Sequence, residues 1–500
     1  MRVFKKAISL CLALILALSC GSVAFAAEAE SNTCPLVYIP GIMSSDIYED
    51  KNDPDSEVVI PDMQGVADAL VDEIVPLILS YALNRDAQKL GVALAKLVNG
   101  MLDGWFNNPD GTAKGNMGVY CEYPDAEEIA TYGKVTFLYD WRADPFVIAA
   151  ELDAYINHVL KISGSEKVAI ATHSLGSVVA LTYLTVYGTD KVHGLVYDTP
   201  VIEGVSYIGE LLSGTVNITG EAVSGILKSV LGITGYEEIL SLLVDAINIA
   251  NVTGVIAITV DDILEIAAPV LFKETLIPLF ACWPTIWAMT PEESMDAAIQ
   301  FVFEENGADG TYDELRAKVE KYNIDVRATR HDTLLTLDDT AKVAVLSRYG
   351  FSSMPISEKW VNISDLVVDT KTNSLGATTA PYGEYFDDEY LSGKDLAYIS
   401  PDKTVDASTC LFPEKTWFFK DSMHNDTHMT SPLYTELLFG EEEFTCDTFT
   451  LSRFTVCDRE NEEFVEDTSK PEKVEKKSPV KILFDFILAL FRKLAELFSK

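Results

Sequence analysis

Short apolar runs alternate with longer segments of helical periodicity along most of the chain. In one such helical segment, the apolar positions are Leu152, Tyr155, Ile156, Val159 and Leu160. The expected strands cover residues 36–40, 135–141, 195–197, 343–346 and 416–419, and a further strand begins at residue 168. This alternation predicts an α/β protein with a mainly parallel sheet and helices on both faces.

Two long helical insertions interrupt the alternation, at about residues 62–106 and 205–323. Both are rich in Leu, Ile, Val and Ala. Long insertions at the mouth of a sheet commonly build caps or lids, so a helical cap is one interpretation. Helices that only enlarge the core are the other, and the pattern does not separate the two.

The first 26 residues have the features of a secretory signal peptide. Basic residues precede a long apolar stretch, and Ala24-Phe25-Ala26 is a small-x-small cleavage site. Cys20 would suggest a lipoprotein anchor, but Ala17 and Leu18 match a lipobox poorly. No later stretch is an uncharged apolar span of transmembrane length, since residues 239–260 contain Asp245, Asn248 and Asn251. We expect a secreted, extracellular protein.

The C-terminal end changes in composition. Residues 467–479 form a polar, proline-containing linker, and residues 480–500 have the pattern of an amphipathic helix with basic residues. The stripe consists of Leu483, Ile487, Leu490, Leu494 and Leu497. Such a helix suits attachment to a membrane or cell surface. Docking on the acidic body and self-association as a coiled coil are the alternatives.

Composition and charge restrict the partners. With 500 residues, 48% of them hydrophobic, the chain can bury one large core and a cap. The formal net charge of −39 argues against a nucleic-acid partner, because phosphate backbones repel an acidic surface.

Residues 441–466 resemble a hairpin of two alternating strands, in which Cys446 and Cys457 would face each other and form a disulfide.

The segment Thr172-His173-Ser174-Leu175-Gly176 lies between an apolar run with strand character and one with helix character. It resembles the G-x-S-x-G nucleophile elbow, with a threonine in place of the first glycine. A strand-to-helix turn with a capping serine is the alternative on these residues alone. If Ser174 is a nucleophile, the glycine turn Pro40-Gly41-Ile42 would supply one oxyanion-hole amide, from Ile42, and Leu175 the other.

Three motifs in this order resemble the lecithin:cholesterol acyltransferase family. They are Pro40-Gly41, Tyr139-Asp140-Trp141-Arg142 and His173-Ser174-Leu175-Gly176. The resemblance runs from about residue 34 to residue 440. It implies an α/β-hydrolase fold, a catalytic domain at residues 27–440 and a triad in the chain order Ser, Asp, His.

The two remaining triad members are sought late in the chain. His428 is preferred as the base because Ser431-Pro432 looks like the start of a helix just after it, and His424 is the alternative. His173 is expected to pack at the elbow, and His331 to lie near a helix end. Asp402 is preferred as the acid, because Pro401-Asp402-Lys403-Thr404-Val405 resembles the family's G-D-G-T-V stretch. The competing acids are Asp365, Asp369 and Asp406.

These residues predict a secreted serine lipase or acyltransferase that acts on lipid esters, phospholipid or acylglycerol, through Ser174, His428 and Asp402. Such a triad needs no cofactor, and no Cys/His cluster has zinc-site spacing. A small-ester esterase, a peptidase and a hydrolase-fold binding protein without catalysis remain alternatives.

Overall fold

The computed structural model describes residues 34–59, 102–215, 272–353, 361–440, 445–458 and 463–471, together with single positions between 89 and 100 and at 359 and 461. The predicted signal peptide at residues 1–26 and the predicted amphipathic tail at residues 480–500 lie outside this part of the chain. Most of the first helical insertion also lies outside it, as do residues 216–271 of the second.

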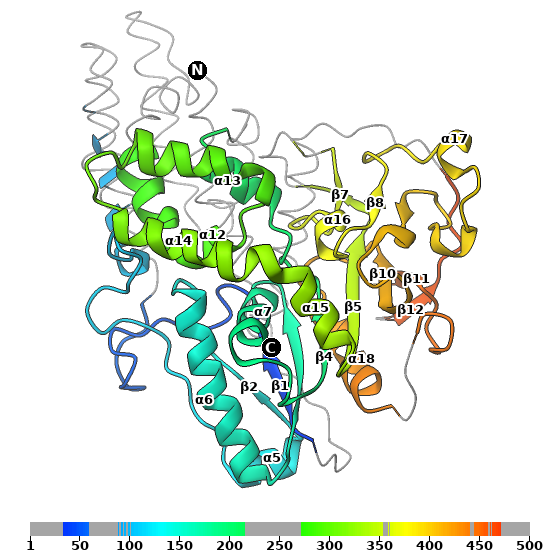
Figure 1. Ribbon diagram of the computed structural model, residues 1–500, viewed down its shortest axis with the longest axis horizontal. Coiled ribbons are helices and arrows are strands. Elements are labelled where there is room, and N and C mark those ends of the chain that lie inside the picture. Colours follow the sequence, from blue (N-terminus) through cyan, green and yellow to red (C-terminus); the bar gives the residue numbers. More distant parts are fainter. Residues whose placement is uncertain are drawn as a thin grey trace, which may run out of the picture.

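A central sheet of eight strands organises the molecule (Figure 1). All neighbouring strands in it pair in parallel except β11 and β12, which pair antiparallel. The prediction of a mainly parallel α/β protein is therefore confirmed. From one edge to the other the strands are β12 (Glu463–Glu466), β11 (Phe454–Asp458), β10 (Thr416–Lys420), β5 (Lys342–Tyr349), β4 (Val192–Asp198), β3 (Val168–His173), β1 (Leu36–Ile39) and β2 (Lys134–Thr136).

Alternate strand residues pack against helices on opposite faces of the sheet. Val37 and Ile170 face the cluster that contains α6 (Pro145–Ser163), α7 (Gly176–Tyr187) and α15 (Arg330–Asp338). Leu36 and Ala171 face α18 (Thr427–Phe439) on the other side. Because both faces are covered, these strands are continuous apolar runs in the sequence.

The described part of the second insertion is helical and lies beyond one end of the strands (Figure 1). It packs on the segment after β2, where the rings of Trp141 and Trp283 meet edge to face with centroids 5.0 Å apart. The buried Asn107 Nδ2 donates to the main-chain oxygens of Gly111, Arg142 and Cys282. Apolar side chains of these helices belong to the same core cluster as the sheet, as expected for helices that enlarge the core. We call the helices the cap for their place beyond the strand ends, and they are α8 (Ser206–Leu212), η3 (Phe272–Ala281), α12 (Pro284–Ala288), α13 (Glu292–Ile299), η4 (Gln300–Glu305) and α14 (Asp313–Asp325).

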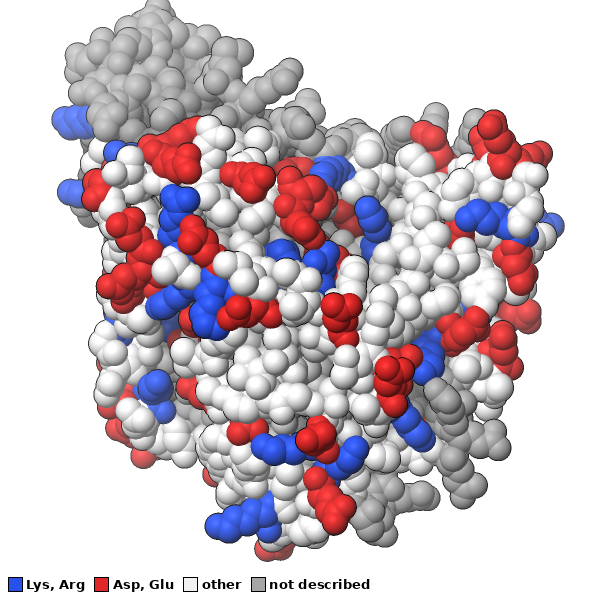
Figure 2. Space-filling view, in the orientation of Figure 1, with Lys and Arg blue, Asp and Glu red and all other residues white. Residues whose placement is uncertain are grey.

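None of the described helices is long and apolar enough to cross a membrane. On the face seen in Figure 2, acidic and basic side chains are interspersed, and several on α14 pair along the helix. The remaining elements are η2 (Asp103–Trp105), α5 (Ala126–Tyr132), η5 (Arg327–Thr329), β6 (Phe351–Ser352), β7 (Ile363–Ser364), α16 (Thr370–Asn373), β8 (Thr378–Thr379), α17 (Asp388–Leu391), η6 (Leu396–Tyr398), β9 (Val405–Asp406), η7 (Ala407–Thr409) and η8 (Pro413–Lys415).

The predicted disulfide between Cys446 and Cys457 is wrong, since neither residue is in a disulfide bond. Cys446 Sγ contacts the main-chain oxygen of Thr416 at the start of β10, whereas Cys457 follows Val456, which pairs with Lys420 at the end of β10. The two cysteines are thus separated by roughly 16 Å along that strand, far beyond disulfide reach. The hairpin in this region is instead formed by β11 and β12.

Candidate active site

Ser174 occupies a strained turn between β3 and α7. Its φ of +52° is in the left-handed region, which a serine adopts rarely. Gly176 is required at the helix start, because a Cβ there would lie 2.2 Å from the main-chain oxygen of Ile39. Thr172, where the elbow motif has glycine, is fully buried, with its hydroxyl 3.4 Å from the Val196 main-chain oxygen. The turn therefore accommodates the threonine beside β4.

The glycine turn after β1 lies directly against this serine. A Cβ on Gly41 would be 3.1 Å from the Ser174 Cβ, so only glycine fits there without displacement. Neither the Ile42 amide nor the Leu175 amide donates a hydrogen bond to any of the described residues. Their role in an oxyanion hole stays a prediction, and the amides are available for it.

The Tyr139-Asp140-Trp141-Arg142 motif holds the glycine turn in place. The Tyr139 hydroxyl donates to the Pro40 main-chain oxygen at 2.7 Å, and Trp141 Nε1 donates to that of Ser45 at 3.1 Å. The buried Arg142 side chain pairs with Asp140 at 2.8 Å. The motif thus acts on the site through the backbone that it supports.

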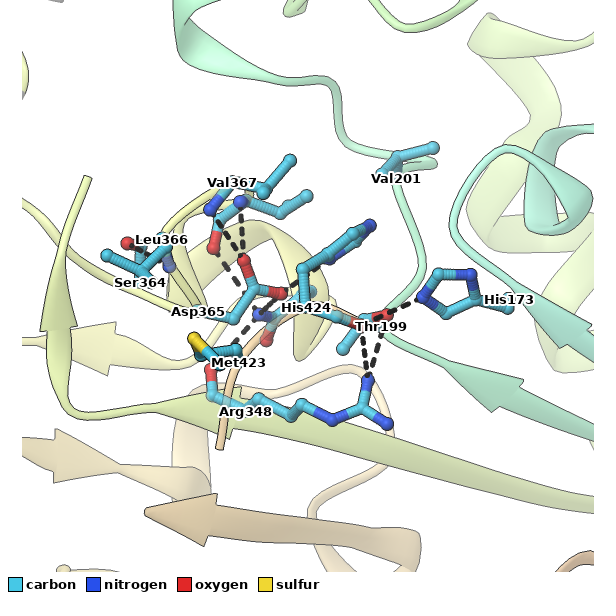
Figure 3. A network of polar contacts seen from close by, with 12 residues as sticks. His173, Thr199, Val201, Arg348, Ser364, Asp365, Leu366, Val367, Met423 and His424 are labelled. Atoms are coloured by element: carbon cyan, nitrogen blue, oxygen red, sulfur yellow. Dashed lines mark hydrogen bonds and ion pairs between the residues drawn. The ribbon is translucent and has the colours of Figure 1, made fainter. Parts of the chain in front are cut away.

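A buried histidine and carboxylate lie next to the elbow. His424 Nδ1 is 2.8 Å from Asp365 Oδ2, and the His424 amide donates to the Asp365 main-chain oxygen at 3.0 Å (Figure 3). Asp365 is fully buried in the loop between β7 and α16, and His424 is 5% exposed in the loop between β10 and α18. Since the carboxylate accepts, Nδ1 carries the ring proton in a neutral imidazole, which leaves Nε2 as the acceptor.

Further donors fix the Asp365 carboxylate. The amides of Val367 and Val368 donate to its Oδ1 at 2.9 and 2.6 Å, and Asn373 Nδ2 donates to its Oδ2 at 3.2 Å. Figure 3 shows Val367 and the His424 imidazole approaching this carboxylate from different sides. The orientation of the acid, and with it that of the His424 ring, is therefore set by the surrounding loop.

His173 connects this pair to the elbow. Its ring lies against that of His424, with centroids 4.8 Å apart, and its Nε2 donates to the His424 main-chain oxygen at 2.9 Å. His173 is thus packed at the elbow as predicted. No hydrogen bond joins the Ser174 hydroxyl to the His424 ring in the described part of the chain. In free enzymes this contact is often long and shortens when substrate binds.

The structure does not bring the two preferred partners together. Asp402 accepts from Lys420 Nζ at 2.7 Å and from the Ser400 hydroxyl at 2.6 Å. Burial alone would raise the pKa of its carboxyl, but Lys420 and Ser400 hold the pKa below its ordinary value. Asp402 therefore binds Lys420, whereas the carboxylate that contacts a histidine beside the elbow is that of Asp365, one of the competing acids.

The preferred His428 lies in a helix, and the histidine that contacts Asp365 is the alternative, His424. The helix α18 begins at Thr427, so His428 lies in its first turn and Pro432 lies inside it. The predicted helix had Ser431 as its N-cap and Pro432 as its first residue, five residues too late. The loop that precedes the helix, where the base was expected, therefore carries the alternative histidine, His424.

The other predicted residues have clear partners. Asp369 accepts from the Ser206 hydroxyl at 2.5 Å and from Asn362 at 2.8 Å, and burial raises the pKa of its carboxyl. Asp406 pairs with Lys394 at 2.8 Å. His331 is in the first turn of α15, as predicted, with its ring 2.6 Å from a Glu203 carboxylate oxygen. Among the described residues, no group of His, Cys, Asp and Glu side chains is arranged to hold a metal ion.

No family model and no curated protein matches this chain. Among solved structures, it is similar to a chain from the crystal structure of the Tle4-Tli4 complex, with 13% sequence identity and a TM-score of 0.26. The match covers 63% of this chain and 75% of that chain. A likeness this weak defines neither the fold nor the activity of this chain.

Proposed function

We propose that this protein is a serine ester hydrolase or acyltransferase of the α/β-hydrolase fold, with Ser174, Asp365 and His424 as its catalytic triad. The observation that carries the proposal is the buried His424–Asp365 pair beside a serine with a φ of +52°. The three residues occur in the chain order Ser, Asp, His, and each follows a strand.

The proposed reaction begins at the serine hydroxyl. His424 Nε2 takes the proton as Ser174 Oγ bonds to the ester carbonyl carbon, and Asp365 stabilises the imidazolium that forms. His424 then returns the proton to the leaving alkoxide as the ester bond breaks, which leaves an acyl-enzyme. Water or an alcohol resolves the acyl-enzyme in the reverse sequence of proton transfers, giving hydrolysis or acyl transfer.

The oxyanion would be stabilised by the amides of Ile42 and Leu175. The close approach of Gly41 to Ser174 supports this, because it brings the turn that carries Ile42 to the elbow. Removal of one such donor costs on the order of 100- to 1,000-fold in kcat in other enzymes.

Lipid esters are the proposed substrates, and the apolar surroundings of the triad support them. Ile42, Met43 and Met423 are half-buried, and they adjoin the glycine turn and the proposed base. Apolar side chains with partial exposure suit the acyl chain of a lipid better than a small polar ester. Export and attachment to a membrane or cell surface through residues 480–500 belong to the same proposal.

Labelling with a fluorophosphonate probe tests the chemistry directly. Full-length protein should be labelled and should hydrolyse p-nitrophenyl esters, and Ser174→Ala should do neither while keeping its thermal transition. A series of acyl chain lengths then tests the substrate class, with rates expected to rise toward long chains. Labelling that persists in Ser174→Ala would refute the nucleophile, and equal rates on short and long chains would refute the lipid assignment.

A further inference from the structure

Arg348 is a fully buried cation near the end of β5, behind the proposed triad. Its guanidinium pairs with the equally buried Asp198 of β4, with Nη1 2.7 Å from Oδ1 and Nη2 3.0 Å from Oδ2. The hydroxyls of Thr430 and Tyr434 also donate to this carboxylate. Two opposite charges are thus held together in the core, between the sheet and α18.

Burial of an ion pair contributes little to stability on balance, because the loss of hydration offsets the attraction. An apolar pair of the same volume would fill the space between β4, β5 and α18 equally well. The Arg348 side chain therefore calls for an explanation beyond packing. That explanation lies in the contacts of the guanidinium with groups other than Asp198.

The guanidinium reaches the loop that carries the proposed base. Arg348 Nη1 donates to the main-chain oxygen of His424 at 3.2 Å, and His173 Nε2 donates to the same oxygen at 2.9 Å. Two side chains, from β5 and β3 on either side of β4, thus converge on one carbonyl group (Figure 3). This carbonyl belongs to the residue whose ring must stay between Asp365 and Ser174.

The backbone of Arg348 supports the acid loop in the same way. Its main-chain oxygen accepts from the Thr370 hydroxyl and from Asn373 Nδ2, both at 3.1 Å. Asn373 Nδ2 also donates to Asp365 Oδ2. One residue therefore connects the loop of the proposed base and the loop of the proposed acid to the sheet.

We infer that Arg348 is a positioning residue, which holds the His424 main chain so that the imidazole keeps its place between Asp365 and Ser174. This inference rests on the proposed function. Asp198 neutralises the cation, which allows a guanidinium to be used for this purpose beside a histidine that must become positively charged. A displacement of about 1 Å in such a group is enough to cost about 100-fold in rate.

The test uses three variants of the full-length chain. Arg348→Met combined with Asp198→Asn removes the contact and both charges, so that no lone charge stays buried. Arg348→Lys keeps a cation and a donor. Thr430→Val is the matched control, because it removes a 2.8 Å contact of the same guanidinium on a residue that does not touch His424.

The measurements are kcat and KM on a short soluble ester, and the far-downfield proton NMR resonance of the Asp365-bound His424 ring, assigned by its loss in His424→Gln. We expect the double variant to lose at least tenfold in kcat with KM changed less than twofold, and to broaden the ring-proton signal. Arg348→Lys should recover part of the kcat and part of the ring-proton signal. Thr430→Val should keep the wild-type kcat and ring-proton signal, even if its melting temperature falls.

A folded double variant with wild-type kcat and a sharp ring-proton signal would overturn the inference. So would a loss of kcat in Thr430→Val as large as that in the double variant, which would indicate a general loss of stability. Absence of turnover in the wild-type protein would instead refute the proposed function. In that case the ring-proton comparison still decides whether Arg348 holds His424.

Discussion

Asp365 and His424 contact each other twice, once through their side chains at 2.8 Å and once through their main chains at 3.0 Å. The main-chain bond fixes the distance between the two loops, and the side-chain bond then fixes the ring within that frame. The pair is therefore held in one geometry without a substrate, which suits the role of general base that we propose for His424.

Replacement of Asp365 tests the acid. Asp365→Asn should lower kcat on a p-nitrophenyl ester by roughly 1,000- to 10,000-fold, because the amide stabilises the wrong tautomer and no imidazolium. Asp369→Asn is the matched control, since Asp369 is a buried carboxylate four residues away that binds Ser206 instead. The reverse pattern of activities would identify Asp369 as the acid.

The same assay distinguishes the roles of the two neighbouring histidines, His424 and His428. His424→Gln should lose at least 1,000-fold in kcat, as expected for removal of the general base. His428→Gln should keep kcat within a few-fold, because this residue lies in the first turn of α18 and is not a member of the proposed triad. Steady-state kinetics with fluorophosphonate labelling measure both, and an inactive His428→Gln that folds normally would contradict the assignment.

Space at the glycine turn provides a third prediction. A methyl group at residue 41 would lie 3.1 Å from the Ser174 Cβ and 3.0 Å from His173 Nδ1, so Gly41→Ala should lower kcat at least tenfold by displacing the turn. Gly100→Ala is the control, because a Cβ there meets no atom within 4 Å. Initial-rate assays on a soluble ester should show this difference in kcat between the two variants. Equal activity of the two variants would argue against the tight contact at Gly41.

The Asp402–Lys420 pair predicts a pH-dependent contribution to stability. The pKa of Asp402 is lower in the folded protein than the ordinary value of about 3.9, so its contribution is present above pH 4 and is lost as the pH falls through the folded-state pKa. Asp402→Asn should therefore lower the free energy of unfolding by roughly 1–3 kcal/mol at pH 7. Urea titrations should show this difference shrinking toward pH 3, while kcat at pH 7 changes less than threefold.

The structure also sets where the tail can be removed. Asp467 accepts from the Tyr349 hydroxyl at 3.0 Å and Ser469 binds Lys420 at 2.8 Å, so a chain that ends at Pro471 keeps both contacts. This shortened protein should keep full turnover of soluble esters and lose binding to lipid vesicles in a flotation assay. Vesicle binding equal to that of the full chain would show that residues 472–500 are not the attachment segment.

Local patterns predicted the strands and the two turns of the site. The apolar run before Ser174 and the Pro40-Gly41 turn each report a backbone geometry that neighbouring residues determine, so both were found at the right place. The length of β2 was overestimated, because the strand ends at Thr136 and the residues up to Trp141 instead pack against Trp283 and Thr285 of the cap.

Local sequence patterns could not identify the proposed acid and base, because contacts between distant parts of the chain bring these two residues together. Asp365 follows the short strand β7 and Asp402 precedes the short strand β9, both in an acid-rich region. The pairing of β6 with β7 accompanies the contact of Asp365 with His424, and no local pattern indicates it. For the histidine, the Ser-Pro pair was a misleading start signal, because α18 tolerates Pro432 in its interior. No local feature distinguishes a proline at a helix start from one within the helix.

Asn107 has a consequence for how this protein can diversify. Its amide group joins the segment after the first insertion to the loop of Arg142 and to the cap at Cys282. A cap exchanged as a cassette from another chain would have to supply again the acceptor that Cys282 provides for this buried donor, and failure to do so would cost roughly 1–3 kcal/mol of the roughly 5–15 kcal/mol by which a domain is stable. We therefore expect new substrate specificity to arise by single substitutions in the cap, with its backbone retained.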